Sequence, residues 1–255
     1  LDVGVEALSN IGFTLALLGF PDQALTRVRE AVSLAEELSH PFSLAFALIY
    51  AAIVHGHLGD WRALRESADA LMTISTEHGF SLYLLMGASV KAMMPVQRVP
   101  VEEDIEEMRQ LLDAFEAADM KLRRPFSFAL MAQWYGGGGQ PSEGLALIAE
   151  AEEIAEKTGE RWSDAEIHRV KGELLLLESK DDAAERCFHK AIEVARKQQA
   201  KSWELVASTG LARLWQRQGK KDEAHKLLSD IYGWFTEGFD TAPLRDVKEL
   251  LEELS

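Results

Sequence analysis

The chain has 255 residues, 47% of them apolar, and carries a formal net charge of −15. The apolar fraction is sufficient for a packed core, so disorder is not the default state. The negative charge argues against a nucleic-acid backbone or an anionic membrane as the main partner. Cys187 is the only cysteine and has no internal partner for a disulfide, which predicts a cytoplasmic protein.

The first predicted element begins almost at once, because a helical pattern directly follows Leu1, which is not an initiator methionine, and we expect no export leader. We therefore expect the chain to be a piece of a longer protein. The next helix, over 42–59, is the most apolar stretch of the chain, but Pro41 precedes it and two histidines, His55 and His57, end it. We predict a buried helix there, because a membrane span needs about 20 consecutive apolar residues.

A forty-residue repeat then predicts the elements from the first residue to the last. One series of small residues runs Gly12, Ala52, Ala92, Ala132, Gly172 and Ala212. A second series runs Gly19, Gly59, Val99, Gly139, Ser179 and Gly219. We expect the first series to let two helices of a hairpin approach closely. The second series, mostly glycine, is expected to end the first helix in the left-handed conformation.

The second helix of each hairpin is predicted to begin just after this turn. Pro21, Asp60, Pro141, Asp181 and Asp222 are the residue types that cap a helix or occupy its first turn. The pattern resembles that of tetratricopeptide (TPR) repeats. It predicts an all-α fold: one right-handed α-solenoid over 1–255, with six hairpins and a C-terminal capping helix. The predicted repeats are 1–40, 41–80, 81–120, 121–160, 161–200 and 201–240, with the cap at 241–255.

The third and fourth repeats depart from this pattern. Pro95 lies near the end of one first helix, Val99 and Pro100 replace the glycine turn, and the neighbouring repeat carries four glycines over 136–139. Because proline and glycine weaken a helix, we expect the first helix of the fourth repeat to stop early. The two departures predict either a local widening of the solenoid or a functional hinge.

The stretch "IYGWFTEGFDT" (231–241) gathers four aromatic residues, Tyr232, Trp234, Phe235 and Phe239, before a final charged helix. A terminal repeat must cover its outer face. We therefore predict that this stretch and the helix over 242–254 seal the end of the stack, with Trp234 buried in the seal.

The chain shows no arrangement typical of an enzyme. His55 and His57 lie two apart and point to different faces of a helix, so they do not share a metal ion. Cys187 occupies an inward helix position without a partnered histidine. The acidic runs at 102–108 and 150–157 have apolar residues between the carboxylates and read as solvated helix faces. We predict no catalytic residue, no cofactor and no metal.

Binding is expected instead on the concave side of the solenoid, which the first helices line. The candidate groove residues are Phe13, Phe46, Ile49, Ile53, Met86, Met93, Phe126, Arg169 and Arg213. The N-terminal part of this groove is apolar, whereas the C-terminal part, which also includes Gln133 and Glu173, is polar and charged. Exposed apolar concavities usually mark binding. The alternative is that long, tightly wound helices simply bury the stripe.

Four segments carry a resemblance to a known family: 17–48, 157–176, 187–224 and 231–254, the last reading "IYGWFTEGFDTAPLRDVKELLEEL". They resemble the C-terminal repeat region of bacterial multidomain regulators, which join an adenylate cyclase or DNA-binding domain to a STAND-type ATPase and then to helical repeats. The resemblance is weakest over 90–122. It implies a sensing or scaffolding module, and it carries over no catalytic residue.

These observations predict a non-catalytic scaffold that binds a protein or peptide partner, or its own upstream domains, in the groove. The alternative from a different class is a sensor in which a small-molecule effector fills the apolar N-terminal groove. A closed pocket near Phe46, Ile49, Met86 and Phe126 would favour the effector, and an open channel would favour the peptide.

Overall fold

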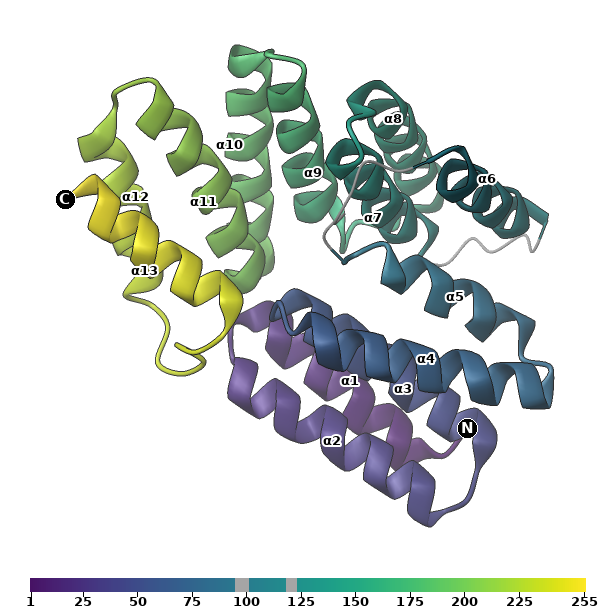
Figure 1. Ribbon diagram of the computed structural model, residues 1–255. Coiled ribbons are helices and arrows are strands. Elements are labelled where there is room, and N and C mark those ends of the chain that lie inside the picture. Colours follow the sequence, from purple (N-terminus) through teal and green to yellow (C-terminus); the bar gives the residue numbers. More distant parts are fainter. Residues whose placement is uncertain (95–100, 118–122) are drawn as a thin grey trace. The chain divides into compact units, whose positions relative to one another are not determined.

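The computed structural model describes residues 1–94, 101–117 and 123–255, and over these ranges the chain is helical and contains no strand (Figure 1). The helices are α1 (Val3–Leu18), α2 (Pro21–Glu37), α3 (Pro41–His57), α4 (Trp61–His78), α5 (Ser81–Lys91), α6 (Glu102–Ala117), α7 (Arg124–Gly137), α8 (Pro141–Thr158), α9 (Asp164–Leu177), α10 (Asp181–Gln198), α11 (Lys201–Arg217), α12 (Lys221–Tyr232) and α13 (Ala242–Leu254). The all-α class is confirmed. Among the described helices, none combines the length and apolar character needed to cross a lipid bilayer.

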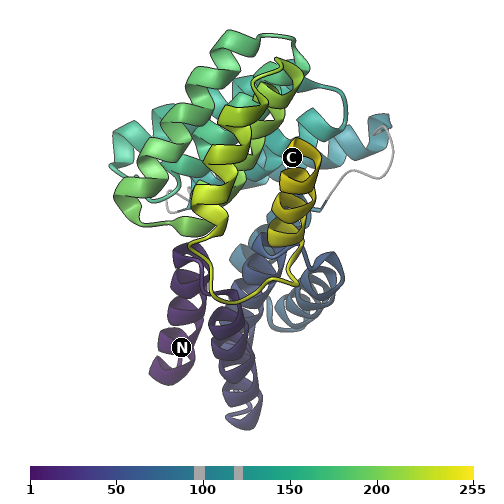
Figure 2. The same cartoon turned by 90° about the vertical axis from the view of Figure 1, so that its left-hand side faces the viewer.

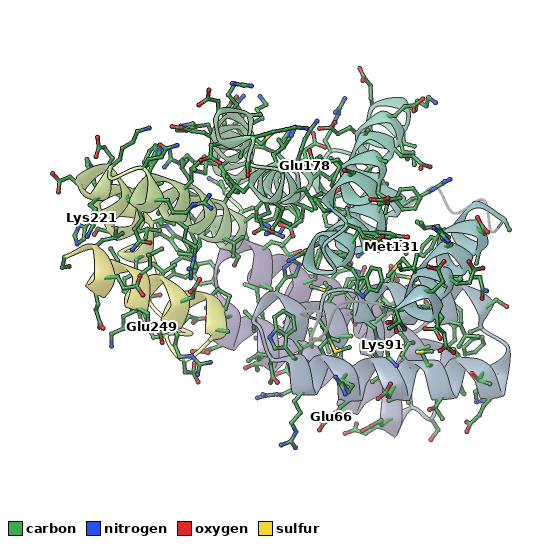
Figure 3. The ribbon with its side chains drawn as sticks, turned by 45° about the horizontal axis from the view of Figure 1, so that its top comes forward. Glu66, Lys91, Met131, Glu178, Lys221 and Glu249 are labelled. Carbon is green, nitrogen blue, oxygen red and sulfur yellow. The ribbon has the colours of Figure 1, made fainter. Side chains whose placement is uncertain are left out.

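The helices form two compact units, which are described separately. Unit 1 comprises Leu1–Met94 together with Glu237–Ala242, and unit 2 comprises Pro95–Thr236 together with Pro243–Ser255. Within each unit a first helix packs against its own second helix and against the first helix of the next hairpin, as α7 does with α8 and α9. Side chains fill the spaces between these helices (Figure 3). A single solenoid over the whole chain, and its handedness, remain predictions.

The forty-residue register is visible in the helix boundaries. The second helices α2, α4, α8, α10 and α12 begin at residues 21, 61, 141, 181 and 221. Before each of them, the turn residue has a positive φ, from 93° at Gly19 to 59° at Ser179. Asp60 caps α4, because its carboxylate accepts a hydrogen bond from the Ala63 N–H at 3.1 Å. The predicted turn is thus confirmed wherever the structure describes it.

The small residues lie at the closest helix crossings, as predicted. A Cβ atom added at Gly12 would lie 2.6 Å from Cγ1 of Val28, which belongs to the second helix of the same hairpin. One added at Gly172 would lie 2.9 Å from the ring of Phe188 on α10. Ala132 and Ala212 are fully buried. A larger side chain at these positions would hold the two helices apart.

The glycine run of the fourth repeat does not shorten its first helix. α7 continues through Gly136 and Gly137 and ends at the same register position as α3, α9 and α11. The expectation of an early stop is therefore wrong. Packing is the physical reason, since Gly136 is buried against Leu174 of the next first helix, and tertiary contact outweighs the low helix propensity of glycine. The predicted break at Pro95, Val99 and Pro100 lies outside the described residues.

The C-terminal end of unit 2 is sealed by Phe235, one of the aromatic residues of the predicted seal, but not by Trp234. Phe235 is 6% exposed and packs with the apolar face of α13, whereas Trp234 is 37% exposed. In Figure 2, α13 is the yellow helix that ends at the C-terminus. The prediction that Trp234 is buried is wrong, because its ring lies outside this cluster, against Lys201 and the edge of Phe235.

Residues 237–242 belong to unit 1, where they close the start of α2. The Glu237 carboxylate accepts hydrogen bonds from the backbone N–H groups of Asp22 and Gln23 at 3.0 and 3.2 Å. The N–H of Ala242 donates to the carbonyl of Leu58 at 3.2 Å. The residue before α2, Phe20, provides no side-chain cap, so Glu237 supplies the negative charge that a helix N-terminus favours.

Candidate functional site

A cleft of about 580 Å³ opens in unit 2 between the first helices α7, α9 and α11. It is lined by Gln133, Gly136, Gly137, Val170, Glu173, Leu174, Leu176, Leu177, Phe188, Gly210, Arg213, Gln216 and Arg217. The apolar residues come mainly from α9, and the polar residues come from all three helices. The cleft therefore combines apolar surface with several groups that can form hydrogen bonds.

Glycines on the two outer helices shape this cleft. A Cβ atom added at Gly136 would lie 2.6 Å from Cδ2 of Leu174, and one added at Gly210 would lie 2.6 Å from the Phe188 ring. Without side chains at these positions, the backbones of α7 and α11 come close to the apolar side chains of α9 and α10. Leu174 and Phe188 are held between neighbouring helices as a result.

A buried ion-pair network holds two residues of the cleft lining, Gln133 and Glu173. The guanidinium of Arg169 donates twice to the Glu166 carboxylate at 2.7 Å, once to Glu173 at 2.5 Å, and once to the side-chain oxygen of Gln133 at 3.2 Å. Burial disfavours the charge of Arg169, but the two carboxylates outweigh this effect and raise its pKa. Glu173 and Gln133, which line the cleft, are thereby fixed in position.

Helix α11 contributes two arginines to the lining, Arg213 and Arg217. Arg213 is paired with Asp246 of α13, and the side chain of Gln216 donates to Glu253 at 3.1 Å. Arg217 is exposed, and no ion pair of its guanidinium is seen among the described residues. Arg217 therefore presents positive charge to a group that enters the cleft, whereas the charge of Arg213 is balanced by Asp246.

The predicted groove residues divide between the two units. In unit 1, Phe13, Ile49 and Ile53 are buried, whereas Phe46, Met86 and Met93 are half-buried. The rings of Phe13 and Phe46 pack on Tyr50, with centroids 5.9 and 4.8 Å away. The structure thus places the buried members in the packing between helices. The groove as a continuous surface remains a prediction.

In unit 2, Phe126 and Arg169 are buried and Arg213 is exposed. Phe126 packs on Trp162 at 5.0 Å between centroids. Arg213 lines the cleft together with Gln133 and Glu173, which occupy the same position of the forty-residue repeat. The structure brings these three side chains together.

Several residues of the cleft were missed by sequence reasoning. Leu174 and Phe188 follow the general apolar pattern of their helices, so nothing in the sequence separates them from ordinary core residues. The glycines at 136, 137 and 210 offered a better signal, because glycine inside a helix costs stability unless a close approach requires it.

The remaining polar candidates are the histidines of α3 and Cys187 of α10. Among residues 1–94, 101–117 and 123–255, no three His, Cys, Asp or Glu side chains are grouped as metal ligands would be. Burial lowers the pKa of His55, although Asp60 at 3.8 Å opposes this effect. Burial also raises the pKa of the Cys187 thiol, which keeps the thiol protonated at neutral pH.

No protein-family model matches this chain, and none of the curated proteins matches it. Among solved structures, the chain is similar to that of a thermophilic TPR protein from Thermus thermophilus, with 19% sequence identity over 98% of both chains and a TM-score of 0.41.

Proposed function

We propose that this chain is a non-catalytic helical-repeat scaffold that binds a protein partner through the cleft of unit 2. The observation that carries the proposal is the cleft itself, which three successive first helices line with apolar residues on one side and arginines on another. Helical repeats present extended surfaces of this kind to protein segments.

The chemistry of the lining indicates what such a segment carries. Leu174 and Leu177 offer apolar contact, and Arg217 offers hydrogen bonds to a carboxylate. Glu173 pairs with Arg169, which it shares with Glu166, so it repels an acidic group less than a lone carboxylate does but keeps part of its negative charge. The best match is a short segment with an apolar side chain next to an acidic one.

The resemblance to bacterial cyclase and STAND-type regulators extends this proposal. In such an arrangement the partner segment belongs to an upstream domain of the same protein, and the cleft regulates that domain by holding or releasing the segment. Release and capture then shift the population of the upstream switch.

A small-molecule effector is the second candidate, and the size of the cleft favours it. Its volume of about 580 Å³ falls within the range of about 300–1,000 Å³ usual for small-ligand sites. None of Phe46, Ile49, Met86 and Phe126, near which a closed pocket would favour an effector, lines this cleft.

Selection of displayed peptides on the full chain tests the proposal. We expect enrichment of peptides that pair an acidic with an apolar residue, and loss of their binding in Arg217→Glu. Arg186→Glu is the matched control, because Arg186 is also exposed but lies on α10 away from the lining. Equal binding by both variants, or no enrichment, contradicts the proposal. A metabolite that raises the melting temperature of the native chain but not of Arg217→Glu supports the effector instead.

A further inference from the structure

The first helix, α1, carries an apolar stripe that solvent reaches. Val3 is 78% exposed and Ile11 is 47% exposed, and Ala7 between them is also exposed. These three residues, here named the open stripe, lie four positions apart and so share one face of the helix. Exposed apolar side chains grouped in this way are typical of an interaction surface.

The same register positions are covered in the later hairpins. Forty residues after Ala7 and Ile11, Ala47 and Ala51 of α3 are buried, and forty residues after Val3, Ser43 is buried. In unit 2, the corresponding Ile167, Ala207 and Leu211 are buried as well. Exposure at these positions is therefore a property of α1, not of the repeat.

In α3, α5 and α11, the element that covers these positions is the second helix of the preceding hairpin. Ala47 packs with Ala31 and Ala35 of α2. Gly87 of α5 faces Leu71 and Met72 of α4, since an added Cβ atom would lie 3.3 and 3.1 Å from their side chains.

Unit 2 repeats the arrangement. Ala207 and Leu211 of α11 pack with Ala184, Phe188 and Ala191 of α10. Where the register position carries a lysine, the preceding second helix supplies a carboxylate instead. Lys91, labelled in Figure 3, pairs with Asp69 of α4 at 2.5 Å, and Lys171 pairs with Glu152 of α8 at 2.7 Å.

We propose that the open stripe is the docking surface for the second helix of a further hairpin of the same forty-residue type. The interface between α2 and α3 defines the occupant, because the same register positions recur one repeat earlier on α1 and are exposed there. That occupant is an amphipathic helix with small apolar residues four apart, as Ala31 and Ala35 are on α2. Ile11, like Leu211, packs favourably against an apolar side chain. It has no charge to pair with a carboxylate, unlike the lysines at this register position.

The test extends the full chain by a second copy of residues 1–40 placed directly before Leu1. The repeat contains no insertion, so the added second helix precedes α1 at the spacing at which α2 precedes α3. We expect hydrogen exchange of the α1 amides to slow by about tenfold or more, because helix packing protects backbone amides. The melting temperature is expected to rise.

Ile11→Glu in the original copy of the extended chain should abolish this protection, while it changes the unextended chain little. Leu38→Glu is the matched control, because Leu38 is also 47% exposed but lies outside the open stripe. Three results would overturn the proposal: no added protection in the extended chain, equal effects of the two variants, or a dimer of the unextended chain that Ile11→Glu dissociates. The dimer would assign the stripe to a second copy of the chain.

Discussion

Replacing Phe235 with alanine tests how unit 2 ends. Phe235 is 6% exposed and lies in a cluster with Leu228 and Ile231 of α12 and with Leu244 and Val247 of α13. The substitution removes the ring from this cluster and leaves α13 without one of its contacts to the last hairpin.

The expected loss is about 3 kcal/mol, the lower end of the range of about 3–5 kcal/mol for phenylalanine to alanine in a core. The lower end applies because Phe235 lies between two helices, in a segment that is not itself helical, and such a segment can partly collapse into the space. Trp234→Ala is the control. Its ring is 37% exposed, and we expect a loss of less than about 1 kcal/mol.

Native-state hydrogen exchange of the α13 amides is the suitable assay, because the chain has two units and its unfolding need not be two-state. We expect the opening free energy of α13 to fall in Phe235→Ala and to stay nearly unchanged in Trp234→Ala. The reasoning is refuted if Trp234→Ala costs as much as Phe235→Ala, or if neither variant changes exchange in α13.

Three further predictions concern the turns, the crossings and pH. Gly12→Val should lower stability by about 2 kcal/mol in urea denaturation, because its side chain overlaps Val28 at the crossing of α1 and α2; an unchanged midpoint would contradict the close approach. Ser179→Gly should raise the melting temperature, because Ser179 has a φ of 59° and the left-handed region costs about 1 kcal/mol for a residue with a Cβ. For the same reason, Gly219→Ala at the same register position should lower the melting temperature. Burial lowers the pKa of His168 in the folded chain from its ordinary value of 6.5. As the pH falls, the unfolded state therefore binds a proton at His168 before the folded state does. The stability of the fold should fall as the pH drops below about 6.5. His168→Gln should weaken that dependence, and an identical pH profile would refute the assignment.

The sequence contained enough to predict the hairpins because their determinants are local. A small residue at each crossing and a turn residue forty positions apart act on their own helices, so Gly12 and Gly19 could be interpreted without knowledge of the fold. The same was true of Asp60, whose capping role depends only on the next three residues.

The predictions failed where contacts between residues far apart in the sequence determine which side chain is buried or which residue stays helical. Trp234 and Phe235 are adjacent aromatic residues, and only the position of α13 determines which of them is buried. Gly136 stays helical because Leu174 of another hairpin packs on it. The cleft also depends on contacts between hairpins. The sequence therefore predicted that Glu173 and Arg213 line a groove, but it did not identify the apolar residues that line the cleft with them.

The most direct test of the stacking that creates the cleft is a set of nuclear Overhauser effects in the full chain, with phenylalanine and glycine selectively labelled. The ring of Phe188 lies against Gly172 of its own hairpin and against Gly210 of the next one. We predict strong cross-peaks from the Phe188 ring protons to the α-protons of both glycines. A cross-peak to Gly172 without one to Gly210 would show that the hairpins form without stacking, and would contradict the account of the cleft.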